Sequence, residues 1–162
     1  MVQKRTRTVK ILAALMAAAL LLCACSGGAD GAGQKEPPAD EIAQRIIDTC
    51  TFDELIKLED TVLYNQYGDL SEDIVVDAAV YASTMVTADE VCVIRVADED
   101  DVQAARAAIE TRLEELADKF TGYREEELPK IQNAVIETHG TYLLMTTATD
   151  GETAAAEFEK MF

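Results

Sequence analysis

Residue types that mark well-known catalytic and metal-binding motifs are scarce in this chain of 162 residues. It contains no tryptophan, one histidine, three prolines and four cysteines, and aromatic residues make up 6% of it. One histidine excludes the His-Glu-x-x-His zinc motif, and no glycine-rich phosphate loop is present. The two cysteines beyond Cys25 are too few for a disulfide-rich scaffold. We therefore expect no catalytic motif, no metal site and no cofactor.

Basic residues are scarce as well. Lysine and arginine number 14 against 31 acids, which gives a net charge of −17 at neutral pH. Such a surface repels nucleic-acid phosphates, so nucleic-acid binding is excluded. It also repels anionic lipid headgroups, so attachment to a membrane would need a lipid anchor and not a basic patch. Cationic ligands, metal ions and basic peptides remain electrostatically compatible partners.

The apolar run 11–22 near the N-terminus is short for a membrane-spanning helix. Twelve residues in a helix reach about 18 Å, which is less than the ~30 Å of a hydrocarbon core. Small residues follow the run, and it is preceded by four basic residues and no acid, namely Lys4, Arg5, Arg7 and Lys10. This is the layout of a secretory signal.

The end of that run resembles the lipobox of bacterial lipoproteins. In Leu22-Cys23-Ala24-Cys25, leucine lies at −3 and alanine at −1 relative to Cys25. The resemblance implies a diacylglyceryl group on the Cys25 thiol and cleavage by signal peptidase II between Ala24 and Cys25. Cys23 fits less well, because Leu22 would then occupy −1, where a small residue is expected. Acylation with palmitate-type chains would hold the protein at the extracytoplasmic face of the cell membrane.

These features divide the chain into three parts. Residues 1–24 are the predicted lipoprotein signal peptide, and 25–38 are the lipidated cysteine and a flexible linker rich in glycine and alanine. Residues 39–162 are long enough for one domain with one core. Removing 1–24 removes four basic residues and no acid, so ten basic residues face 31 acids and the net charge becomes −21.

Hydrophobic periodicity predicts an α+β domain. A spacing of three to four residues indicates helices, and an alternating pattern indicates strands. The helices are expected over 39–50, 60–67, 98–123 and 152–162, and the strands over 74–83, 90–97, 134–138 and 141–147. A two-residue turn at His139-Gly140 would pair Ile136 with Leu143. The simplest arrangement is a four-stranded antiparallel sheet packed by helices, in the order α-(α)-β-β-α-β-β-α.

The two faces of this sheet have different expected roles. The long helix should cover the face that carries Val76, Val80, Ile94, Ile136 and Leu143. The opposite face carries Tyr81, Tyr142 and Leu144. Either the first helix covers it, or it is an exposed apolar patch that binds a protein or peptide partner. Tyr81, Tyr142 and Leu144 are the candidate contact surface of the second alternative.

The remaining polar and sulfur-containing residues leave several alternatives open. Cys50 and Cys92 could form a disulfide or remain two buried thiols. The acidic run 98–101 is explained by the positive end of a helix, with divalent-cation binding as the alternative. Residues 125–127 are expected to be a solvated acidic loop, and His139 a turn residue. Asp89 and Glu90 are an alternative acid/base pair, although strand neighbours point to opposite faces.

Residues 40–162 resemble a small bacterial lipoprotein family known as domain of unknown function 4358. The resemblance is carried by the segments 40–48, 81–83, 87–90, 128–136 and 140–142. It implies extracytoplasmic anchoring and supplies no catalytic residue. Together these features predict a membrane-anchored extracytoplasmic lipoprotein whose domain is a non-enzymatic binding module. The alternatives are a cell-envelope enzyme that uses acidic residues and a divalent-cation-binding module.

Overall fold

The computed structural model describes residues 36–68, 70–84 and 86–162. The predicted signal peptide, the lipidation site at Cys25 and most of the linker therefore lie outside the described residues. The described residues fall in one compact unit. Within the described part of the chain, none of the helices combines the length and the apolar character needed to cross a bilayer.

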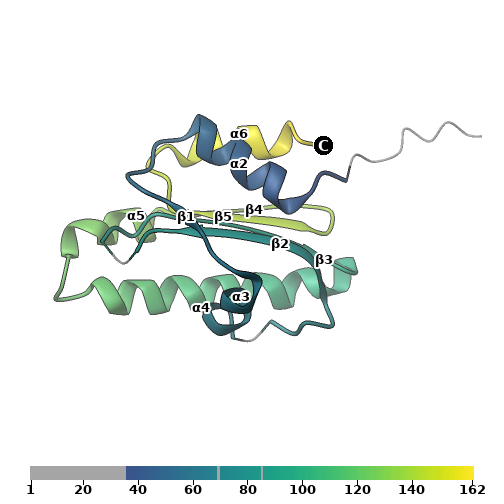
Figure 1. Ribbon diagram of the computed structural model, residues 1–162, viewed down its shortest axis with the longest axis horizontal. Helices are drawn as coiled ribbons and strands as arrows, with labels where there is room; N and C mark the ends of the chain where they lie inside the picture. The colour runs from purple at the N-terminus through teal and green to yellow at the C-terminus, as the bar shows by residue number, and fades with distance from the viewer. Residues whose placement is uncertain (1–35, 69, 85) are drawn as a thin grey trace, which may run out of the picture. The chain divides into compact units, whose positions relative to one another are not determined.

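The described domain has three layers, with an antiparallel sheet between two layers of helices (Figure 1). Helices α2 (Ala39–Thr49) and α6 (Gly151–Glu159) lie on one face. Helices α3 (Asp60–Gln66) and α4 (Val102–Phe120) lie on the other. The short α5 (Leu128–Gln132) packs against α4 at one end of the sheet. The strands are β1 (Ile56–Lys57), β2 (Val75–Ala82), β3 (Glu90–Val96), β4 (Val135–His139) and β5 (Tyr142–Thr146), in the order β1-β2-β3-β5-β4.

The α+β class and the antiparallel sheet are confirmed, but the described sheet has five strands and not four. The additional strand is β1, which pairs Ile56 with Ala82 and Lys57 with Tyr81. Two residues are too few to show an alternating pattern, so periodicity could not reveal this strand. Helix α5 and the short 3₁₀ turns Glu99–Asp101 and Glu125–Glu127 were also not predicted.

Each face of the sheet has its own hydrophobic core. The core beneath α2 and α6 contains Ile42, Ile46, Val93, Leu144 and Phe158 among its buried residues. The core beneath α3 and α4 contains Leu63, Val80, Ile94, Ile109 and Leu143. A sheet that is covered on both faces buries nearly all of its central strand, and only one residue of β3 is not fully buried.

A β-bulge in β2 changes the predicted face of Val76. Val75 lies opposite Val96 and Asp77 lies opposite Arg95, so two steps along β2 correspond to one step along β3. Val76 is the extra residue, and its side chain is 53% exposed. The predicted burial of Val76 beneath the long helix is therefore wrong, and Val75 packs there instead.

The hairpin register also differs from the prediction. His139 pairs with Tyr142, and Ile136 lies opposite Met145 instead of Leu143. The turn residues are therefore Gly140 and Thr141, and Gly140 has a φ of 53°, the left-handed conformation that primed turns need at this position. A slip of two residues keeps every side chain on its predicted face.

The two cysteines of the domain are free thiols. Cys50 is partly buried against the core beneath α2 and α6, whereas Cys92 is buried in the core on the opposite side of the sheet. Since the sheet separates the two thiols, the structure excludes the disulfide alternative and leaves the alternative of two free thiols.

Candidate functional site

The predicted contact face is covered and does not form a surface. Tyr81 is 9% exposed, Tyr142 is 4% exposed and Leu144 is fully buried. The Tyr81 hydroxyl donates a 2.8 Å hydrogen bond to Asp40 of α2, and the Tyr142 hydroxyl donates one of 3.1 Å to the carbonyl of Pro37. The prediction that these three residues form a contact surface is therefore wrong, because α2 and α6 occupy that face.

The two acids of the alternative acid/base pair have separate partners. Glu90 is buried and binds the Arg112 guanidinium in a bidentate manner, at 2.7 and 3.1 Å. The Tyr67 hydroxyl donates a further hydrogen bond of 2.7 Å to Glu90. Burial raises the pKa values of Tyr67 and of the neighbouring Cys92 thiol, so both groups stay protonated at neutral pH. This cluster is a charge-paired network inside the core, closed to solvent.

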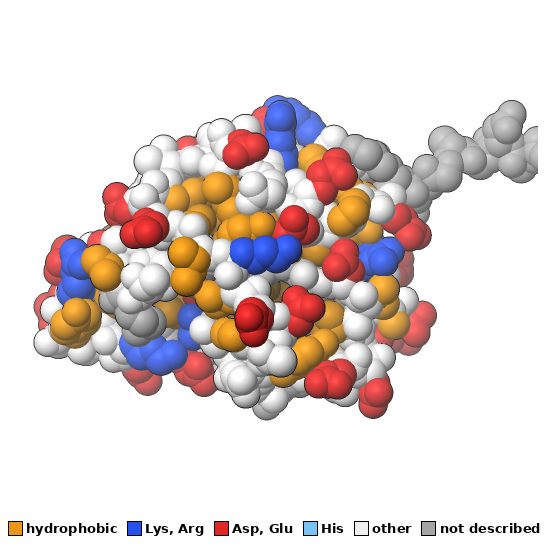
Figure 2. Space-filling model, in the orientation of Figure 1, with side chains coloured by type: hydrophobic (Ala, Val, Ile, Leu, Met, Phe, Trp, Pro, Cys, Tyr) orange, Lys and Arg blue, Asp and Glu red, His pale blue; other side chains and the backbone are white. Residues whose placement is uncertain are grey.

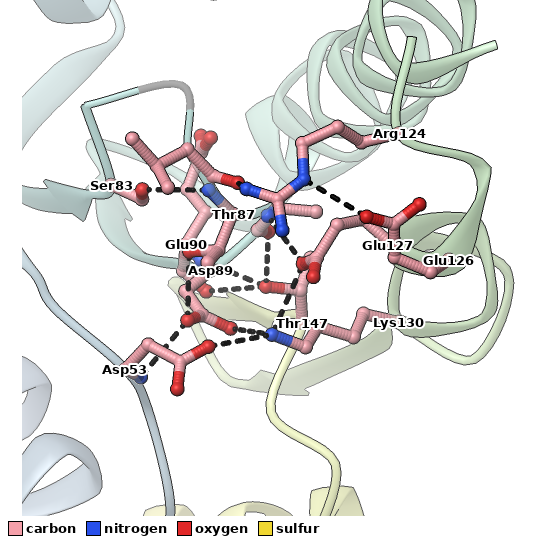
Figure 3. A network of polar contacts seen from close by, with 12 residues as sticks. Asp53, Ser83, Thr87, Asp89, Glu90, Arg124, Glu126, Glu127, Lys130 and Thr147 are labelled. Atoms are coloured by element: carbon pink, nitrogen blue, oxygen red, sulfur yellow. Dashed lines mark hydrogen bonds and ion pairs between the residues drawn. The ribbon is translucent and has the colours of Figure 1, made fainter. Parts of the chain in front are cut away.

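Asp89 belongs to a second network, which lies at the end of the sheet near α5 (Figure 3). The Lys130 ammonium lies 2.8 Å from Asp89, 3.1 Å from Glu127 and 3.4 Å from Asp53. Asp89 also accepts a 2.9 Å hydrogen bond from the Thr87 hydroxyl. Figure 3 shows the Lys130 side chain pointing into the space between Asp53 and Asp89.

The second network fixes α5 and the turn before it to the sheet. Burial lowers the pKa of Lys130, but hydrogen bonds from its ammonium to Asp89 and Glu127 outweigh this and raise it. The lysine is therefore a cation at neutral pH and a poor base. Glu127 is 7% exposed and accepts a 2.9 Å hydrogen bond from the amide of Ala88. The expectation of a fully solvated loop at 125–127 is therefore wrong for Glu127, because its carboxylate anchors the turn.

The other polar residues singled out in the sequence lie outside both networks. The acids 98–100 are exposed and precede α4 through a 3₁₀ turn. Among the described residues, no three histidines, cysteines or acids are grouped so that they could hold a metal ion. The prediction that His139 is a turn residue is wrong, because His139 ends β4 and pairs with Tyr142. Its ring stacks on Phe162 at a ring distance of 4.1 Å and lies 3.3 Å from Glu159.

A partly open cavity of about 170 Å³ lies beside β2 and is the site that sequence reasoning missed. One wall is formed by Leu58, in the segment that joins β1 to α3, and by Leu63 and the ring of Tyr64 on α3 itself. Residues 75–78 and Val80 of β2 form the other wall. The bulge at Val76 is part of this wall, so the shape of the cavity depends on a feature that hydrophobic periodicity does not encode.

The charge around this cavity has one sign. Glu59, Asp60 and Asp77 line it, and none of the described residues that line it is a lysine or arginine. Burial raises the pKa of the Tyr64 hydroxyl, and the carboxylates of Glu72 and Asp60 raise it further. The phenol therefore lies in a negative field. Figure 2 shows hydrophobic side chains interspersed with acidic ones, and a smaller number of lysine and arginine side chains, across this side of the domain. The arrangement suits a ligand that has an apolar group and a positive charge.

Comparison with known proteins places the chain in a family. The family model described as Domain of unknown function (DUF4358) matches residues 50–148. The chain belongs to this family. The match confirms the resemblance to domain of unknown function 4358 over residues 50–148. It includes every residue that lines the cavity, whereas α2 and α6 lie outside it. No curated protein and no solved structure matches the chain.

Proposed function

We propose that this DUF4358 protein is an extracytoplasmic lipoprotein, held at the cell membrane by acyl chains on Cys25. The observation that carries the anchor is the sequence Leu22-Cys23-Ala24-Cys25 at the end of the apolar run 11–22. A basic start and a following glycine-rich linker accompany it, as in a secretory signal. Two or more acyl chains give lasting attachment, since each buried CH₂ contributes about 0.8 kcal/mol.

The role proposed for the domain is non-enzymatic binding of a protein or peptide. The cavity beside β2 carries this proposal, because apolar side chains and carboxylates line it together. The other two clusters of titratable residues support it indirectly. Glu90 is held by Arg112 and Asp89 by Lys130, so both carboxylates are already engaged in ion pairs within the domain.

The anchor is tested by metabolic labelling of the full chain with palmitate in a bacterium that processes lipoproteins. The wild type should incorporate label and partition into the membrane fraction, and Cys25→Ala should lose both properties. Cys23→Ala is the matched control, because it removes the other cysteine of the same segment and should keep the label. Labelling that persists in Cys25→Ala, or that disappears in Cys23→Ala, would contradict the assignment.

A further inference from the structure

One edge of the sheet has backbone groups without a neighbouring strand. Strand β1 pairs only with Tyr81 and Ala82, and the amide of Leu58 adds one bond of 2.9 Å to the carbonyl of Val80. Val80 therefore directs its backbone groups away from β3. The backbone groups of successive residues in an antiparallel strand point to opposite sides. Ala78 lies two residues from Val80, so its N–H and C=O point outward as well. Among the described residues, no strand pairs with this outer side of 75–79.

The unpaired part of β2 is also a wall of the cavity. At about 170 Å³ the cavity is smaller than the ~300–1,000 Å³ typical of pockets for whole small-molecule ligands. It is close to the ~150 Å³ that accepts one benzene molecule. The size therefore suits a single apolar side chain that belongs to a longer ligand, and the free edge beside it offers backbone hydrogen bonds to that ligand.

We propose that the cavity and the free edge of β2 are one docking site, which binds an extended basic segment of a partner protein by strand addition. Backbone groups of the segment pair with those of Ala78, one apolar side chain enters the cavity, and lysine or arginine side chains reach Glu59 and Asp60. The inference deepens the binding role proposed above and does not depend on the lipid anchor.

Charge decides between the possible occupants of this edge. A second copy of the chain has a net charge of −17 and would bring its own acidic rim to the pairing edge. Like charges at an interface disfavour the wrong partner, so self-association is opposed. A basic segment is attracted by the same rim, and its encounter rate rises through electrostatic steering. The occupant is therefore a partner of opposite charge.

A synthetic peptide provides the test. The probe is a dye-labelled, capped peptide of sequence Thr-Lys-Thr-Leu-Thr-Lys-Thr, which as a strand places one leucine between two lysines on one face. Its binding to the detergent-purified full chain is followed by fluorescence anisotropy at low salt. A peptide with glutamate in place of lysine should bind at least about tenfold more weakly, because the acidic rim repels it.

Backbone methylation of the peptide tests strand addition on the unmodified protein. Alternate residues of a strand direct their amides to opposite sides. One version is N-methylated on its lysines and leucine, and the other on its inner threonines. Exactly one of the two should lose binding, since only one set of amides faces β2. If both versions bind as well as the parent peptide, strand addition is refuted.

Charge variants of the protein locate the site. Glu59→Lys with Asp60→Lys should weaken binding of the lysine peptide by about tenfold or more and strengthen binding of the glutamate peptide. Glu99→Lys with Asp100→Lys is the matched control, because it makes the same charge change in an exposed acidic run elsewhere. An equal loss in both variants would show attraction to net charge alone and would refute the site. Since Glu59 and Asp60 begin α3, Glu59→Gln with Asp60→Asn provides a milder pair, checked by circular dichroism.

Two further outcomes would overturn the inference. The first is a dimer in sedimentation experiments that disappears in Ala78→Pro, because a second copy would then occupy the edge. Proline is tolerated on an edge strand where its N–H would face solvent, so this variant should still fold. The second is a failure of both peptides to bind. That result would remove the docking site, while palmitate labelling would still decide the anchor separately.

Discussion

At the scale of single residues, the buried pair Glu90–Arg112 dominates the core beneath α4. Both side chains are at most 3% exposed, and two charge-assisted hydrogen bonds join them. Arg112→Met should lower the free energy of unfolding by about 3–5 kcal/mol, because it leaves the Glu90 carboxylate buried without its cation. Urea denaturation of the two proteins measures this difference.

A double replacement separates the value of the pair from the cost of breaking it. Glu90→Leu combined with Arg112→Met removes both charges, so it should recover most of the stability that the single variant loses. If the double variant is as unstable as Arg112→Met alone, then shape and not unpaired charge determines the loss. The hydroxyl of Tyr67 would lose its acceptor in the double variant, so Tyr67→Phe is added as the third substitution.

At the scale of elements, the contact between α6 and β4 depends on a glycine. A Cβ added at Gly151 would overlap the side chain of Val135. Gly151→Ala should therefore destabilise the domain by about 1–3 kcal/mol, even though alanine favours a helix by up to about 1 kcal/mol. Thermal unfolding followed by circular dichroism measures the loss.

Two variants show whether the overlap is the cause. Gly151→Ala combined with Val135→Ala should lose less stability than the sum of the losses in the two single variants. The reason is that alanine at position 135 is smaller than valine and makes room for the new methyl group at position 151. Gly68→Ala is the control, since a Cβ there would meet nothing within 4 Å. Strictly additive losses in the double variant would contradict the proposed overlap.

The elements also show how far sequence reasoning reaches in this protein. Long periodic segments predicted α2, α4 and β3 to within a few residues, because their buried faces repeat over many positions. Local irregularities were not predictable in this way. The bulge at Val76 adds one residue to the pattern, and the position of Gly140 in the turn shifts the hairpin by two residues.

The candidate site was missed for the same physical reason. Its walls are the seven-residue helix α3 with the segment before it, and the bulged part of β2. Neither has a periodic pattern of its own. The exposed or buried state of Tyr81, Tyr142 and Leu144 was equally undecided by the sequence, because α2 was free to cover their face or leave it open. Only the position of α2 over β2 and β3 decided it.

At the scale of the whole molecule, the excess of acids should make stability depend on salt. A net charge of −17 repels itself in the folded state, and salt shortens the Debye length from about 30 Å at 0.01 M to about 8 Å at 0.15 M. Screening also weakens ion pairs, but the exposed ones contribute only about 0–1 kcal/mol each, and the Glu90–Arg112 pair is protected by burial. The melting temperature should therefore rise between low and physiological NaCl concentrations.

A charge-neutralising variant makes that expectation specific to the surface. Glu110 and Glu114 are exposed on α4 and lie one helical turn apart, so they repel each other. Glu110→Gln with Glu114→Gln changes the net charge from −17 to −15. This variant should gain a few tenths of a kcal/mol at low salt and show a smaller rise of melting temperature with NaCl. A melting temperature that falls with NaCl in the wild type would mean that its surface ion pairs contribute more to stability than its net charge costs.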